Sequence, residues 1–204
     1  MQEMRICDVV SGKGRLMTNK NLPEDFYVKI KPRLHRRIGR ELRLANRVID
    51  LGCGSCELVR YLAGTYYQQV TGVDVSSDSF PKRRCLPSGV RIRCIRKNAK
   101  HLDFAKDRSQ DAVVSMCAFH EMEHPDAILK EAYRVLRPGG EILIVDFPRD
   151  SLAQRLWNED YYRPAEFNQM LINAGFTEVQ VRLIEREQII WAKGFRSATE
   201  KENT

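Results

Sequence analysis

A chain of 204 residues is long enough to bury about 70% of the surface that its unfolded form exposes, so one domain spanning 1–204 is the simplest expectation. Its composition, 43% hydrophobic and 30% charged, is that of a soluble globular protein, and no segment approaches the ~18 uninterrupted apolar residues of a membrane span. The net charge of +7 is concentrated at 29–47 and 82–100, which permits anionic partners without demonstrating one.

Residues 1–45 precede the first predicted strand and form an N-terminal arm or cap on a core that spans 46–204. In this arm Leu34, Ile38 and Leu42 recur at helical spacing, and arginines cluster beside them at positions 33, 36, 37 and 40. The pattern predicts an amphipathic helix that packs on the sheet or over its mouth.

From position 47 the chain alternates strands with helices. A short apolar strand, RVIDLG, is followed by Ser55 as the expected N-cap of the helix CELVRYLAG, which Gly64 should end. Further strands are predicted at 69–75, 90–96 and 111–119. A helix at 125–137 should end at the PGG of 138–140, before a fifth strand at 141–147. This alternation predicts an α/β fold with a mostly parallel, doubly wound sheet.

The end of the chain breaks the alternation. After a helical segment at 164–176, the segments TEVQVRLIE and QIIWAKGF are both strand-like. Too few residues separate them for a crossover helix, so they should pair as an antiparallel C-terminal hairpin.

Six cysteines stand at positions 7, 53, 56, 85, 94 and 117, without the spacing of a disulfide framework. The start, MQEMRICDVV, shows no secretory signal, so we expect a cytoplasmic protein whose cysteines are mostly free thiols. A four-cysteine zinc site would show two close pairs, but Cys85 and Cys94 are nine positions apart (94 − 85). No metal site is therefore predicted.

The stretch DLGCGSC at 50–56 supports two interpretations. Its C-x-x-C pair, Cys53 and Cys56, could be a redox couple near a helix N-terminus. Alternatively, the G-x-G between a strand and a helix allows a ligand close to the backbone, and Asp74 ends the next strand, where an acid can accept hydrogen bonds from both ribose hydroxyls. The second interpretation explains more of the context. A metal or a sulfur bridge at the bend would argue against it.

Four segments, in order, resemble the class I S-adenosylmethionine-dependent methyltransferases, with a motif pattern like that of the small UbiE-type enzymes. VIDLGCGSC resembles the first motif of that superfamily, GVDVS at 72–76 the second, and NAKHLDF at 98–104 the adenine-binding segment. Residues 111–146 resemble its fourth strand through its fifth. The resemblance implies a Rossmann-like, seven-stranded sheet, S-adenosyl-L-methionine as cofactor, and methyltransferase activity.

The resemblance also implies roles for individual residues. Asp50 would orient the methionine amino group, Asp74 would hold the ribose, and Asn98 would accept a hydrogen bond from the adenine amino group. The remaining positions would face the cofactor, so that the whole expected binding set is Asp50, Gly52, Cys53, Gly54, Asp74, Val75, Asn98, Ala99, Ser115 and Met116. Two positions depart from the family pattern: Cys56 replaces a usual third glycine, and Asn98 replaces a usual aspartate.

A nicotinamide dehydrogenase would share the two glycines and Asp74, but it usually has a third glycine and gives no reason for the closing hairpin. The sequence HEMEH at 120–124 matches the H-E-x-x-H zinc motif, which needs one helix through both histidines. Pro125 disfavours helical geometry at His124, so a loop is predicted instead. His120 or Glu121 could lie near the transferred methyl group, or both could be ordinary loop residues.

The acceptor is less well indicated. The aromatic residues Tyr27, Trp157, Tyr161 and Tyr162 could line the pocket, but core packing is the favoured interpretation for them. Cys117 should point into the sheet. No NPPY-type tetrapeptide follows the fourth strand. The resemblance to small methyltransferases of this motif pattern implies a small organic acceptor, which is the first hypothesis. Two alternatives stay open: an RNA or other nucleic-acid methyltransferase that uses the basic arm, and a cofactor-binding module without catalysis.

Overall fold

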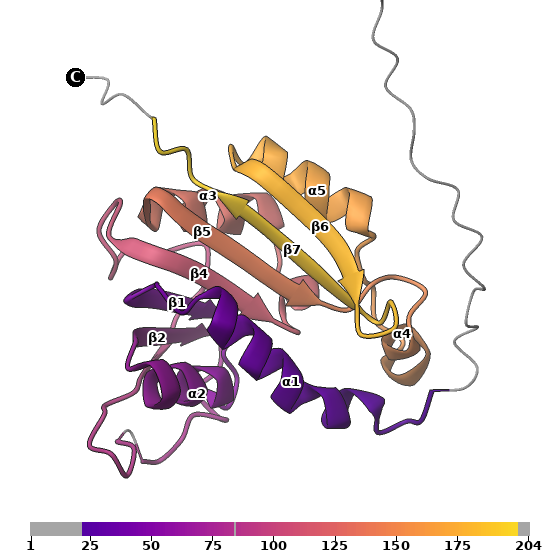
Figure 1. Cartoon of the computed structure of the whole chain (residues 1–204), viewed down its shortest axis with the longest axis horizontal. Helices are drawn as coiled ribbons and strands as arrows, with labels where there is room; N and C mark the ends of the chain where they lie inside the picture. The colour runs from indigo at the N-terminus through magenta and orange to yellow at the C-terminus, as the bar shows by residue number, and fades with distance from the viewer. Residues whose placement is uncertain (1–21, 84, 200–204) are drawn as a thin grey trace, which may run out of the picture.

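The computed structural model describes residues 22–83 and 85–199, and its seven strands form one sheet in the order β3-β2-β1-β4-β5-β7-β6 (Figure 1). The parallel strands are β1 (Arg47–Leu51), β2 (Gln69–Asp74), β3 (Arg93–Arg96), β4 (Gln110–Met116) and β5 (Leu136–Asp146). The hairpin of β6 (Thr177–Ile184) and β7 (Ile189–Phe195) adds antiparallel to β5. The predicted fold class is confirmed. Strand order reverses between β1 and β4, where doubly wound sheets bind ligands.

Helices cover both faces of this sheet, and a separate hydrophobic cluster lies between the helices and the sheet on each face. One cluster takes side chains from α1 (Phe26–Glu41), α2 (Glu57–Tyr66) and α4 (Leu152–Trp157). The other takes them from α3 (Pro125–Val135) and α5 (Pro164–Asn173), together with the short 3₁₀ turn η2 (Phe119–Glu121). Two buried faces explain why the central strands are apolar on both sides. None of the described helices has the length and apolar character needed to cross a bilayer.

Helix α1 confirms the predicted amphipathic helix. Ile30, Leu34 and Ile38 lie on its inner face and are at most 2% exposed. Beside this inner face, Arg33 pairs with Glu185 at 2.9 Å, and the guanidinium of the half-buried Arg37 lies 5.0 Å from the ring centroid of Trp191. The part of the predicted arm at 1–21, including Cys7, lies outside the described residues.

Several predicted boundaries were wrong. Helix α2 begins after Cys56, not Ser55, and runs past Gly64 to Tyr66. Gly64 is useful inside the helix because an added Cβ would come within 3.1 Å of the Leu86 side chain. The PGG of 138–140 lies within β5, where its backbone pairs with Arg196 near the chain end. Strand β3 is shorter than predicted, β4 ends earlier, and the six-residue α4 was not predicted.

The cysteines were predicted to be mostly free thiols, and among the described residues one pair departs from that prediction. Cys56 and Cys94 are joined by a disulfide, with Cα atoms 6.9 Å apart, whereas Cys53, Cys85 and Cys117 are free. Sequence spacing could not reveal the pair, because 38 positions separate the two residues and only the parallel pairing of β3 with β2 brings Cys94 near α2. Cys56 lies two positions after Gly54, so the bridge is adjacent to the Gly52–Gly54 bend and does not occupy the bend itself.

Candidate cofactor-binding site

The glycine bend between β1 and α2 meets the acidic residue at the end of β2. The Gly54 amide donates to one carboxylate oxygen of Asp74 at 2.8 Å, and the Ser76 amide donates to the other at 3.0 Å. The amides of Gly52 and Cys53 both donate to the Val73 carbonyl, at 2.8 and 3.1 Å. These bonds confirm the expectation that the bend and this carboxylate come together at one rim of the sheet.

The two glycines of the bend serve different needs. Gly52 has a φ of +69°, and an added Cβ would strike the side chains of Ala118 and Met122, so the bend packs tightly against the loop after β4. Gly54 has a φ of +46°, and an added Cβ would meet no atom within 4 Å. The space in front of Gly54 is therefore open to a ligand that approaches the backbone.

Two cavities meet at Gly52. The first, of about 340 Å³, lies under α1, and the second, of about 380 Å³, lies over the ends of β2 and β3. The first is walled mainly by Tyr27, Ile30, Leu34, Leu58, Cys117 and Phe147, with Lys31 and His35 also on its lining. The second is lined by Val73, Lys97, Ala118, Met122 and Ile128 beside several predicted binding residues. An elongated ligand that spans Gly52 would occupy both.

Asp50 supplies a buried acid to the first cavity. Its side chain belongs to a residue only 2% exposed, at the end of β1. Burial, and to a smaller extent the charge of Asp74, raise the pKa of Asp50 to about 8. A buried carboxyl that faces a cavity is relieved by a cationic partner, and the methionine amino group of an adenosyl cofactor is such a cation. On these observations the residues fit the cofactor.

The structure gathers nine of the ten predicted cofactor residues at the two cavities. Asp50, Gly52, Cys53, Gly54 and Met116 line the first, and Gly52, Asp74, Val75, Asn98 and Ala99 line the second.

Two members of the predicted set differ from the expectation in their hydrogen bonds. Ser115 lines neither cavity, because its buried hydroxyl donates to the Leu51 carbonyl at 2.9 Å and ties β4 to β1. The side-chain oxygen of Asn98 already accepts from the Lys100 amide at 3.0 Å, which shapes its own turn. Its second lone pair remains for a ligand.

His120 belongs to a network that holds the loop after β4. Its Nδ1 lies 2.8 Å from one oxygen of the buried Asp146, its amide donates to the other at 3.0 Å, and its Nε2 lies 3.2 Å from Glu159. Burial lowers the pKa of His120, but the hydrogen bonds and charge of these acids outweigh burial and raise it overall. His120 lines neither cavity, whereas the adjacent Glu121 lines the second.

The H-E-x-x-H segment does not form one helix. Its first two residues lie in η2, and His124, with a φ of 58°, precedes Pro125 at the start of α3. This confirms the predicted loop. Ligand atoms of His120, Glu121 and Glu159 do lie within 4.8 Å of one another, but the motif's second histidine is not among them.

Of the four candidate aromatic residues, only Tyr27 lines a cavity. Tyr161 is 1% exposed and packs on His120, while Trp157 and Tyr162 pack against other rings. Cys117 lines the first cavity instead of pointing into the sheet, so that prediction was wrong. The sequence interpretation missed Phe147 and Lys31. The apolar stripe of α1 predicted the helix, but it could not predict which turns of that helix face the cavity.

Residues 49–144 match the family described as a methyltransferase domain. A fatty-acid O-methyltransferase of Mycolicibacterium smegmatis is 33% identical over 60% of this chain and 50% of its own length. These matches support a similarity to the class I S-adenosylmethionine-dependent methyltransferases over the part of the chain that carries the bend and the second cavity. The ubiquinone/menaquinone biosynthesis C-methyltransferase UbiE of Nitrosospira multiformis is 26% identical, and the match covers 86% of each chain.

Solved structures of methyltransferases share the fold. The methyltransferase in a complex with the Trm112 activator of Haloferax volcanii has a TM-score of 0.68 at 18% identity, covering 87% of this chain and 96% of its own. The 1,6-didemethyltoxoflavin-N1-methyltransferase of Burkholderia thailandensis, solved with 1,6-didemethyltoxoflavin and S-adenosylhomocysteine, has a TM-score of 0.61 at 18% identity. The match covers 88% of this chain and 87% of that one. The chain spans about half or less of several curated relatives, including 50% of the fatty-acid enzyme.

Proposed function

We propose that this chain transfers a methyl group from S-adenosylmethionine to a small, largely apolar molecule held in the cavity under α1. The observation that carries the proposal is the position of the bend. Gly52 belongs to both cavities, with the buried Asp50 on one side and Asp74 on the other. A ligand with an adenosine end and a cationic amino acid end matches that order of groups.

In this proposal the second cavity receives the adenosine. Asp74 accepts from the ribose hydroxyls, and Val73, Ala99, Met122 and Ile128 provide apolar surface for the base. In the first cavity Asp50 faces the amino group. When bound, the cofactor supplies a methyl group on a sulfonium sulfur, which is a very good leaving group.

The chain's own contribution to the reaction is positioning. A displacement at a sulfonium methyl gains most of its rate from a nucleophile held in line, so a cavity that fixes the acceptor supplies much of the catalysis. The walls from α1 and Phe147 are mainly apolar, so an acceptor that packs against them would displace water from this surface. This favours an acceptor with a hydrocarbon or aromatic body. The name of the M. smegmatis relative, a fatty-acid O-methyltransferase, is consistent with such a body.

We assign His120 a positioning role. Through Asp146 and Glu159 it joins the loop after β4 to the end of β5 and to the segment after α4. The loop carries Ala118, Glu121 and Met122 into the second cavity, so the network shapes the adenosine side. Glu121 remains the candidate for direct contact.

Nucleic acid is a weaker proposal for the acceptor, because α1 uses part of its positive charge internally. Lys31 pairs with Glu57 at 2.5 Å, Arg33 pairs with Glu185 at 2.9 Å, and Arg37 stacks over Trp191. Because these three basic side chains already contact other residues of the chain, α1 offers fewer cations to a phosphate backbone.

The test is to incubate the full chain with methyl-labelled cofactor and fractionated cell extract. We expect label in organic-extractable small molecules. Label confined to RNA would overturn the acceptor class, and no transfer to any fraction, with the cofactor bound, would favour a binding module without catalysis. The Asp74→Ala variant is the negative control for transfer.

A further inference from the structure

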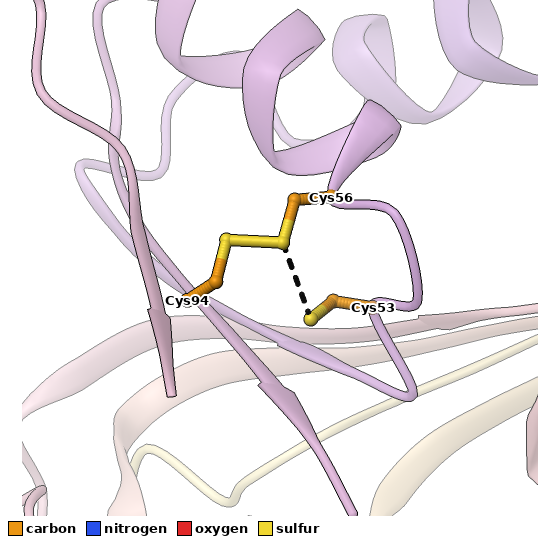
Figure 2. A group of neighbouring side chains, drawn as sticks. All are labelled: Cys53, Cys56 and Cys94. Carbon is orange, nitrogen blue, oxygen red and sulfur yellow. Dashed lines mark hydrogen bonds between the residues drawn. A yellow bond between two sulfur atoms is a disulfide. The ribbon is translucent and has the colours of Figure 1, made fainter. Parts of the chain in front are cut away.

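Three cysteine side chains, two from the segment of the glycine bend and one from β3, meet beside that bend (Figure 2). Cys53 lies in the bend, Cys56 directly precedes α2, and Cys94 lies in β3. Their sulfur atoms all lie within 4.8 Å of one another. A disulfide joins Cys56 to Cys94, and the free Cys53 sulfur lies 3.6 Å from that of Cys56.

Cys56 occupies the joint between the bend and α2 in a left-handed conformation, with a φ of 58°. A side chain makes this conformation costly, whereas glycine adopts it freely. The Cys56 amide donates to the Cys53 carbonyl at 2.8 Å, which closes the bend that presents Gly54 to Asp74. The geometry of the cofactor bend therefore depends on a residue whose own backbone preference opposes it.

The disulfide holds Cys56 in this unfavourable backbone conformation, because its side chain is bonded to Cys94. Cys56 is fully buried and Cys94 is 2% exposed. Cys94 is paired with Gly72 in the parallel ladder of β3 and β2, and β2 ends at Asp74. The bridge thus ties the joint of the bend to β3, which pairs with β2, the strand that carries Asp74.

We propose that the Cys56–Cys94 disulfide is a redox-sensitive tether of the cofactor bend, which strengthens binding of adenosyl ligands when formed and weakens it when reduced. The inference rests on the proposed cofactor site. In the reduction a dithiol supplies two electrons and two protons. Its own sulfurs join, the Cys56–Cys94 bond breaks, and both cysteines become thiols.

Cys53 gives the tether a second way to open, which restores a role for the C-x-x-C pair. Its thiolate can attack the Cys56 sulfur, so that a Cys53–Cys56 bond forms while the bond to Cys94 breaks. Cys94 leaves as a thiolate and takes a proton, with no net oxidation. Because burial and the charges of Asp50 and Asp74 raise the pKa of Cys53, this exchange should be slow.

Reduction should weaken S-adenosylhomocysteine binding about tenfold, the scale expected when one backbone residue must be reordered on binding. The coupling must be reciprocal. A saturating concentration of S-adenosylhomocysteine should therefore make the disulfide about tenfold harder to reduce, which is about 30 mV for a two-electron couple.

Two substitutions at position 56 separate the effect of losing the disulfide from the effect of the backbone conformation at that position. Cys56→Ser and Cys56→Gly both lack the bridge, but only glycine adopts the left-handed backbone freely. We expect the serine variant to bind like the reduced protein and the glycine variant to bind like the oxidised one. Neither should respond to a dithiol. A Cys7→Ser, Cys85→Ser variant, which leaves the three-cysteine cluster intact, should respond like the unaltered protein.

The experiment is calorimetric titration of the full chain with S-adenosylhomocysteine before and after dithiothreitol, with the bridges mapped by peptide mass spectrometry. Equal affinity in the two states, a glycine variant as weak as the serine variant, or a bound metal ion in place of the bridge would overturn the tether. Failure of the oxidised protein to bind at all would overturn the cofactor site as well, which distinguishes the two claims.

Discussion

The two cavities that meet at Gly52 are built in different ways. The cavity over β2 and β3 is formed by strand ends and the loops that follow them, whose positions are set by the parallel sheet. The cavity under α1 is formed by a helix from the N-terminal arm, the end of β5 and the bend itself. In the assignment that we propose, the fixed sheet edge holds the cofactor, and helix α1 determines which acceptor fits.

The largest expected effect is a loss of cofactor affinity caused by a change in the cavity over β2 and β3. Asp74→Ala removes a carboxylate that already accepts from the amides of Gly54 and Ser76 and would accept from the ribose. Hydrogen bonds to a charged group contribute roughly 1.5–3 kcal/mol, so S-adenosylhomocysteine affinity should fall on the order of 100-fold. Calorimetry measures it. The exposed Asp78 in the same loop offers the control Asp78→Ala, which should bind normally. Unchanged affinity in Asp74→Ala would refute the ribose assignment.

The next effect is a pH dependence that belongs to Asp50. With a pKa of about 8 in the free protein, Asp50 holds a proton that a cationic amino group must displace. Affinity for S-adenosylhomocysteine should therefore rise with pH from about 6 to about 8, approaching tenfold per unit. Asp50→Asn should bind more weakly at pH 8 and lose most of this dependence. If affinity in Asp50→Asn depends on pH as steeply as in the unaltered protein, the titrating group is not Asp50.

These two acids also show how far sequence reasoning reaches. Asp50 and Asp74 end adjacent parallel strands, so periodicity and the rule for parallel sheets sufficed to bring them together. Cys94 could not be linked to Cys56 in that way, because the link depends on how far β3 extends and on which way its side chains point. Phe147 and Lys31 were missed for the same reason: tertiary packing, not a local pattern, turns them toward the cavity.

A matched pair of exposed valines sharpens the comparison. Val28 lines the cavity under α1 and is 75% exposed, and Val75 lines the other cavity and is 65% exposed. Replacing either by Asp removes apolar contact worth about 1 kcal/mol, or about fivefold. Val75→Asp should weaken S-adenosylhomocysteine binding. Val28→Asp should leave that binding unchanged and raise the KM for the acceptor. The reverse pattern would exchange the roles of the two cavities.

The smallest expected effect concerns stability. Because the pKa of His120 is raised in the folded protein, its contribution to the unfolding free energy is present below pH 6.5 and is lost as pH rises through the folded value. The raised pKa of Asp50 also makes the unfolding free energy fall as pH rises. The effect of the His120 substitution should therefore be measured in an Asp50→Asn background. There, His120→Gln should lower the melting temperature by about 2–4 °C at pH 6 and by less at pH 9. Equal losses at both pH values would contradict the charged network.

The most direct test of the account is a crystal structure of the chain with S-adenosylhomocysteine. We expect the adenosine in the cavity over β2 and β3 with its ribose hydroxyls on Asp74, and the amino group beside Asp50 in the cavity under α1. A ligand bound away from the Gly52–Gly54 bend, or one lying entirely within a single cavity, would contradict it.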